Sequence, residues 1–215
     1  MADKKANQSY SLISVIDTNS GEKLADIKIP GIELEAMAIE SSGPRLFVNN
    51  RDKNQVDVID REKRTLIASW PVTLAKGNTS LGLDDSTHRL FVASRSGHLV
   101  VFNIDTGKEL QALPIGQGVD DLAFDPATKR IYMSCGGGAG SVDVYKEQDA
   151  DHYQLLGNIP SARNASTPPP SSRSRTLLRA IACRKKPAGS NSGLRNSVDS
   201  PRLPPGRQPN THVTL

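Results

Sequence analysis

The stretch that decides the fold is DDSTHRLFVAS, residues 84–94, in which an acid, four turn-type residues and an arginine lead into an apolar run. The same phrase occurs as ESSGPRLFVNN at 40–50 and as DPATKRIYMSC at 125–135, so the copies begin 44 and then 41 residues apart. A period of this length is typical of repeat architectures, in which each copy buries its faces only against its neighbours. The chain is therefore predicted to be built from repeats.

Each copy contains four short apolar segments separated by turn residues. The first alternates apolar residues around a small one, as in Leu81-Gly82-Leu83, and the second is the apolar end of the phrase itself. The third and fourth follow, for example at 100–104 and 110–115, and no stretch shows a convincing helical period. Four short strands per copy with turn signals at hairpin spacing predict a propeller blade. The acid of the phrase is expected to bond turn amides, and the arginine to pair with it across the hairpin.

The N-terminus enters this pattern halfway through a copy. Residues 12–18 match the third segment and residues 21–27 match the turn and fourth segment, by comparison with 103–110. We therefore predict an all-β fold, a β-propeller fragment of about 3.5 four-stranded blades. Within residues 1–161, the predicted parts are a half blade at 9–31 and blades at about 33–71, 78–115 and 118–160.

The units RLFVNN…VDVIDREKRTLIASWPV and RLFVASRSGHLVVFNIDTGKELQALPIG resemble the YVTN-repeat β-propellers of bacteria, the YncE-like group. The resemblance covers most of the chain and implies a propeller whose repeats specify the framework and leave the loops free. It also implies a ring of about seven blades and a secretion signal, and this sequence shows neither. Related propellers include lactonases, quinoprotein-type dehydrogenases and haem- or copper-containing reductases.

Composition changes abruptly after Ala162. All nine aromatic residues precede it, whereas eight of the 14 prolines follow it. Residues 162–215 hold ten Lys or Arg and one acid, which leaves 17 bases and 22 acids in the preceding part of the chain. The basic character of the chain therefore belongs to this segment. Because so little apolar surface cannot offset chain entropy, we expect a disordered basic Pro/Ser-rich tail.

Two origins of this tail stay open. It is either a genuine basic arm that binds anionic surfaces or the next blade translated in a shifted frame. Thr176-Leu177-Leu178-Arg179 permits codons that, read one nucleotide later, encode Arg-Tyr-Tyr-Val, which is the missing second-strand phrase. We favour the shifted frame, and a nucleic acid is expected as a partner only if the tail is genuine.

Candidate binding residues lie in the loops that enter the innermost strands, because such loops open onto the central channel of a propeller. Aligned positions Glu35, Thr79 and Asp120 are predicted to ring one mouth of the channel, with Asn78 and Asp121 beside them. The adjacent acids Asp120 and Asp121 could hold a cation weakly. Solvent exposure alone would also select polar residues at these positions.

The other motifs predict no chemistry. None of the four histidines has a second His or Cys at ligand spacing, and Cys135 and Cys183 form no CxxC pair. The glycine-rich run 136–141 leads into a strand rather than a helix, so it predicts a hairpin loop and not a phosphate cradle. We expect no catalytic residue, no metal site and no cofactor.

Two classes of function stay open. The first is a non-enzymatic scaffold, a truncated product, that binds a protein or a small ligand through its loop face. The second is a fragment of a propeller enzyme, of lactonase or dehydrogenase type, whose catalytic residues lie in missing blades. Fold alone does not decide between them, but the scarcity of histidine favours the scaffold.

Exposed surfaces and the N-terminal sequence give two further expectations. The open blade faces are expected to self-associate unless a partner covers them. The first 30 residues contain no apolar run long enough for a signal peptide or a membrane span. The product as written is therefore expected in the cytoplasm, and a full-length parent in the periplasm or outside the cell.

Overall fold

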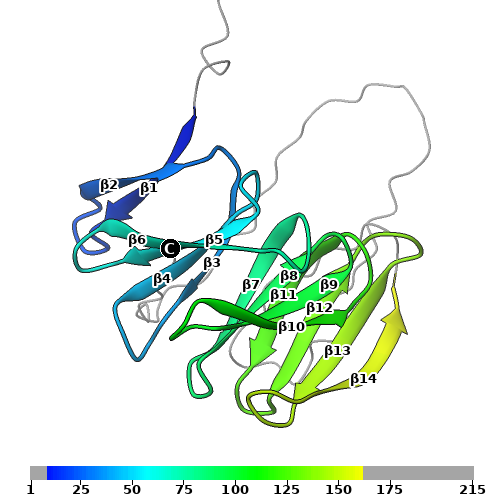
Figure 1. Ribbon diagram of the computed structural model, residues 1–215. Coiled ribbons are helices and arrows are strands. Elements are labelled where there is room, and N and C mark those ends of the chain that lie inside the picture. Colours follow the sequence, from blue (N-terminus) through cyan, green and yellow to red (C-terminus); the bar gives the residue numbers. More distant parts are fainter. Residues whose placement is uncertain (1–8, 162–215) are drawn as a thin grey trace, which may run out of the picture.

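A computed structural model describes residues 9–161, and within them every regular element is a β-strand. Fourteen strands, β1 to β14, follow one another along the chain, and consecutive strands within each sheet pair antiparallel (Figure 1). None of the described residues forms a helix long and apolar enough to cross a membrane. The tail after Ala162 lies outside the described residues, so its disorder and its shifted frame stay predictions.

The strands form one two-stranded sheet and three four-stranded sheets. The two-stranded sheet, or half blade, pairs β1 (Tyr10–Ile16) with β2 (Lys23–Pro30). The first blade contains β3 (Leu34–Ile39), β4 (Arg45–Asn50), β5 (Gln55–Asp60) and β6 (Thr65–Pro71). The second contains β7 (Asn78–Asp84), β8 (Arg89–Ser94), β9 (His98–Asn103) and β10 (Lys108–Pro114). The third contains β11 (Val119–Asp125), β12 (Arg130–Cys135), β13 (Ser141–Glu147) and β14 (Tyr153–Pro160).

The blades stack face to face with their first strands innermost. Strands β3, β7 and β11 lie beside one another, and in the half blade β2 contacts the outer strand β6 (Figure 1). The half blade therefore supplies only the third and fourth strands of a blade. This arrangement is a partial β-propeller, which confirms the predicted all-β fold class.

The hydrophobic core consists of three layers, one between each pair of neighbouring units. Because successive residues of a strand point to opposite faces, strands β4, β5, β8 and β9 each contribute to two of these layers. In the layer between the first and second blades, Trp70 lies between Phe47 and Phe102, at ring-centroid distances of 5.5 and 6.2 Å. Each blade is thus stabilised by its neighbours rather than by a core of its own.

The repeated phrase forms the turn between the first and second strands, and its acid bonds turn amides. Asp84 accepts a hydrogen bond from the Ser86 amide, and Asp125 accepts one from the Ala127 amide. The predicted pairing of the arginine with the acid occurs in the first copy, where Glu40 and Arg45 form an ion pair. It does not occur in the second copy, because Arg89 pairs with Asp151 instead.

Candidate functional site

The innermost strands give the array two distinct ends. We call the end where β3, β7 and β11 begin the mouth end, and the end that carries the three phrase turns the turn end. The predicted binding residues lie at the mouth end, while the most strongly perturbed acids lie at the turn end.

Two short ion pairs mark the mouth end, and a longer one joins Arg51 Nε to Glu33 Oε2 at 3.9 Å. Arg51 Nη1 lies 3.2 Å from Glu35 Oε1, and Arg95 Nη2 lies 3.1 Å from Asp120 Oδ1. Both arginines directly follow the second strand of a blade. Because the second blade has Thr79 where the first has Glu35, Arg95 pairs with the acid of the following blade. All four charged side chains of the short pairs are between 33% and 43% exposed, so their pairs are hydrated and contribute at most about 1 kcal/mol each.

Asn78 and Thr79 lie at the same end but are buried. The Asn78 amide donates to Asn49 Oδ1 at 2.8 Å, which links the second blade to the first. The Thr79 hydroxyl lies 3.3 Å from the carbonyl oxygen of Val119, which links the second blade to the third. These two predicted residues therefore connect blades and do not present their side chains at the surface.

Asp120 and Asp121 have different partners. Asp120 pairs with Arg95, whereas Asp121 Oδ1 accepts a hydrogen bond from the Leu122 amide at 2.8 Å. Within residues 9–161, no group of three or more His, Cys, Asp or Glu side chains is placed to hold a metal ion. The mouth end thus presents paired charges of both signs. Sequence reasoning found its acids but missed Arg51 and Arg95, although an arginine directly after the second strand recurs in two copies.

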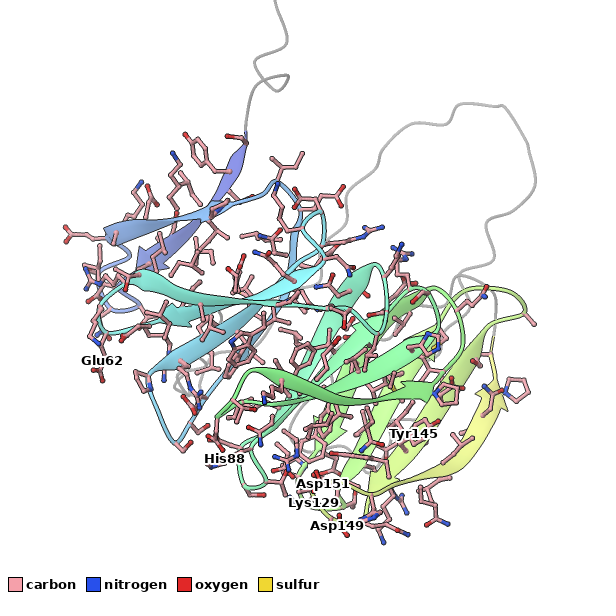
Figure 2. All side chains as sticks on the ribbon, in the orientation of Figure 1. Glu62, His88, Lys129, Tyr145, Asp149 and Asp151 are labelled. Carbon is pink, nitrogen blue, oxygen red and sulfur yellow. The ribbon has the colours of Figure 1, made fainter. Side chains whose placement is uncertain are left out.

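The turn end contains a buried acid pair that sequence reasoning did not single out. The side chains of Asp84 and Glu147 are only 3% and 1% exposed. Lys129 forms an ion pair with Asp84, and its Nζ lies 4.0 Å from Glu147 Oε2. Thr87 donates to Glu147 Oε1 at 2.8 Å. The cluster joins the second blade to the third, and Lys129 lies in the charged region at this end (Figure 2).

Burial, and after it the hydrogen bond with Asp84, raises the pKa of Glu147 to about 7. Burial acts in the same direction on the pKa of Asp84, but hydrogen bonds from Glu147, Lys129 and Ser86 outweigh it and hold that pKa well below its usual range. Two carboxylates that share a buried site cannot both ionise at little cost. Below about pH 7, Glu147 therefore carries the proton, and Asp84 carries the charge that Lys129 balances.

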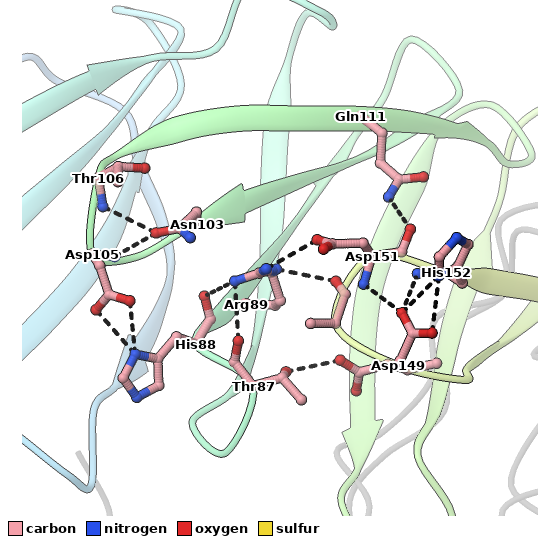
Figure 3. Close-up of polar contacts among 12 residues, drawn as sticks. Thr87, His88, Arg89, Asn103, Asp105, Thr106, Gln111, Asp149, Asp151 and His152 are labelled. Atoms are coloured by element: carbon pink, nitrogen blue, oxygen red, sulfur yellow. Dashed lines mark hydrogen bonds and ion pairs between the residues drawn. The ribbon is translucent and has the colours of Figure 1, made fainter.

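Further polar contacts lie at the turn end (Figure 3). The Arg89 guanidinium donates to the carbonyl oxygen of Ala150 at 3.0 Å and pairs with Asp151 at 2.9 Å. His88 Nδ1 lies 2.9 Å from an oxygen of Asp105 within the second blade. The Arg89 contacts add to the connection between the second and third blades, whereas the His88 contact stays within the second.

Two solved structures share this architecture. The hydrazine synthase of Kuenenia stuttgartiensis superposes with a TM-score of 0.62 at 15% identity, over 70% of this chain and 43% of that chain. A chain of the mitotic checkpoint complex superposes with a TM-score of 0.58 at 15% identity, over 72% of this chain and 51% of that chain. The protein thus spans about half the length of either structure or less, and the likeness shows a β-propeller-type fold alone.

No family model matches the chain, and no curated protein matches it either. The YVTN resemblance accordingly stays a prediction.

Proposed function

We propose that this chain is a non-enzymatic β-propeller scaffold of the YVTN type, a truncated product, that binds a protein partner through the loops of its mouth end. The observation that carries this proposal is the set of four partly exposed charges, Glu35, Arg51, Arg95 and Asp120, which three successive blades hold on a rigid frame. Loops on a rigid scaffold are where proteins place most of their binding residues.

The chemistry of these four charges suits a polar protein surface. Both signs are present and each pair is partly hydrated, so a partner with complementary charges can exchange ion pairs with them at low cost. Charge complementarity of this kind favours correct partners and fast association more than it adds affinity. A small ligand bound at the same end is the alternative that the experiment below distinguishes.

An enzymatic function has less support. One similar structure is named as an enzyme and the other as a protein complex, so the shared fold favours neither class. A catalytic pair of acids must reach its substrate, and the most strongly shifted acids, Asp84 and Glu147, are almost fully buried. Because Asp84 and Glu147 are buried where the second blade contacts the third, they support a structural role in a scaffold rather than a catalytic one.

The test is affinity capture from a lysate of the native host, with the full chain as bait and quantitative mass spectrometry as readout. The mouth variant Arg51→Glu/Arg95→Glu is compared with Lys23→Glu/Lys63→Glu, which reverses two exposed, ion-paired lysines at the turn end. We expect at least one protein to be lost tenfold or more from the mouth variant alone, and to bind the wild type again when purified. The proposal fails if every captured protein binds all three baits equally, or if only a small molecule responds to the mouth variant in a thermal-shift screen.

A further inference from the structure

The buried acids at the turn end hold a primary amine between them. Lys129 Nζ contacts Asp84 Oδ2 and donates to the Ser86 hydroxyl at 2.8 Å. The same nitrogen lies 4.0 Å from Glu147 Oε2. An amine that loses a proton is a nucleophile, and a protonated carboxyl group is an acceptor for it. The cluster therefore contains every group that is needed to form an amide bond between two side chains.

This combination occurs at one of the three phrase turns. The residue before the phrase arginine is Pro44 in the first copy, His88 in the second and Lys129 in the third. Only the third copy thus places a primary amine at this position. In the first copy the acid Glu40 pairs with Arg45, whose guanidinium stays protonated in proteins and does not act as a nucleophile.

The surroundings of the cluster are largely apolar. The side chains of Asp84 and Glu147 are 3% and 1% exposed, and Lys129 Nζ lies 5.8 Å from the centre of the Phe124 ring. Buried charges are costly, so a neutral amide in their place is favoured, and exclusion of water protects it from hydrolysis. Lys129 itself is 35% exposed, which gives a released water molecule a way out.

We propose that Lys129 and Asp84 join in an isopeptide bond that the chain forms by itself, with Glu147 as the proton relay. The amine nitrogen bonds to the carboxyl carbon of Asp84, the bond from that carbon to Oδ2 breaks, and Oδ2 leaves as water. One amine and one carboxylic acid give one amide and one water, so no oxidant or cofactor takes part. The ion pair described above is the state before this reaction.

Glu147 supplies and takes up the protons. Its pKa of about 7 suits a group that both loses and regains a proton near neutral pH. Glu147 shares a hydrogen bond with Asp84, through which it passes its proton to that carboxylate, and it then takes one from the Lys129 ammonium. After the amine attacks, Glu147 gives this proton to the departing Oδ2 and accepts a second one from the nitrogen. It ends protonated, as it began.

The other oxygen of Asp84 is held where negative charge grows during the attack. Oδ1 accepts hydrogen bonds from the Ser86 amide at 3.0 Å and from the Ser86 hydroxyl at 2.7 Å. Donors aimed at such an oxygen stabilise the transition state. Contact between the amine and the carboxyl group adds to this effect, since well-oriented groups in one molecule react as if at about 10⁵–10⁸ M.

The bond would link the second blade to the third. It joins residues that are 45 positions apart, and a covalent link of this kind constrains the unfolded chain. The reaction involves no residue of the mouth end, so this proposal is independent of the proposed binding surface.

Intact-mass spectrometry of the full chain, kept overnight at pH 7, tests the proposal. We expect the wild type to be lighter than its sequence by one water molecule. Trypsin should then release residues 77–89 joined to residues 109–130, because a linked Lys129 is no longer cleaved. The matched control is Lys129→Arg, which retains the charge but not the primary amine and should keep its full mass.

The variant Glu147→Gln separates a proton relay from a structural role. Its near-ultraviolet circular dichroism should match that of the wild type, while the linked fraction should form at least tenfold more slowly. A wild type of full mass would overturn the proposal, and so would a loss of water without the joined peptides or one that persists in Lys129→Arg. Equally fast linkage in Glu147→Gln would exclude Glu147 as the relay.

Discussion

The first and second blades are built from nearly the same phrase, yet only the second is covered on both faces. All six residues of β8 are buried, and Leu81 is in the core, whereas Met37 of the first blade is half exposed. The sequences at these positions are equally apolar, so the difference arises from the neighbour and not from the strand. In a repeat protein, each residue is stabilised mainly by the unit that follows or precedes it. Substitutions at equivalent positions should therefore have unequal effects.

The largest difference is expected for side chains in the core layers. Phe91 is fully buried, with its ring 5.4 Å from Phe124 and 5.8 Å from Tyr153 between centroids. Phe91→Ala should lower the free energy of unfolding by about 3–5 kcal/mol, because it leaves a cavity between two blades. Met37→Ala should lower it by about 1 kcal/mol or less, because water already reaches that side chain. Urea unfolding of the full chain measures both, and equal losses would contradict the role of the neighbouring unit.

The second prediction concerns the pH dependence of the buried acids. In the folded protein the pKa of Glu147 is raised from 4.5 to about 7, so folding favours its protonated form. This contribution to stability is complete below pH 4.5 and is lost as the pH rises to about 7, by at most about 3 kcal/mol. Glu147→Gln retains a neutral side chain and should remove this decline, so the variant should be the more stable protein at pH 8. Thermal unfolding between pH 5 and 8 tests this, and parallel profiles for variant and wild type would refute it.

Glu40, the acid that begins the repeated phrase in the first blade, should respond in the opposite direction to Glu147. The hydrogen bond and charge of Arg45 hold the pKa of Glu40 below its usual value, against the effect of burial. Its contribution is present above its unfolded pKa and is lost as the pH falls through the lowered value. Glu40→Gln should therefore reduce the loss of stability that occurs at acidic pH. Between pH 6 and 8, the dependence of stability on pH should stay unchanged. A change confined to neutral pH would show that Glu40 behaves like Glu147.

The fourth prediction concerns the close approach of the second and third blades. Gly82 occupies the position of Ala38 and Ala123, and a Cβ there would collide with Leu122. Gly82→Ala should therefore lower the free energy of unfolding by about 1–3 kcal/mol. Combined with Leu122→Ala, it should cost less than the sum of the two single changes, because the shortened side chain gives the new methyl group room. Strict additivity in urea unfolding would place the two residues out of contact.

The fold was predictable because it depends on a pattern that each copy carries in full. The acid, the turn and the apolar run recur at a nearly constant spacing, and the N-terminal segment matches the second half of a copy, as β1 and β2 do in the structure. Strand formation and hairpin pairing are local, so one sequence was enough to predict them.

The contacts at both ends were less predictable because they join residues from different blades. Asn78 is of a residue type that is usually found in exposed loops. In the structure, however, it is fully buried and donates a hydrogen bond to Asn49, 29 residues away. Arg89 was expected to pair with Asp84, but Asp84 pairs with Lys129 of the next blade, and Arg89 pairs with Asp151 62 residues away. The rotation between neighbouring blades decides which of several nearby charges form ion pairs, and this rotation cannot be predicted from a single sequence.

The smallest effect on stability is expected at the mouth end, where the Arg95–Asp120 ion pair is partly hydrated. A double-mutant cycle on Arg95→Ala and Asp120→Ala should give a coupling energy of at most about 1 kcal/mol, because water and salt screen two partly exposed charges. In 1 M salt the coupling should fall towards zero, since the Debye length shrinks to about 3 Å. A coupling that is large or independent of salt would mean that Arg95 holds the second and third blades together as the buried Lys129–Asp84 pair does. The mouth charges would then be structural, and the proposed binding surface would lose its main support.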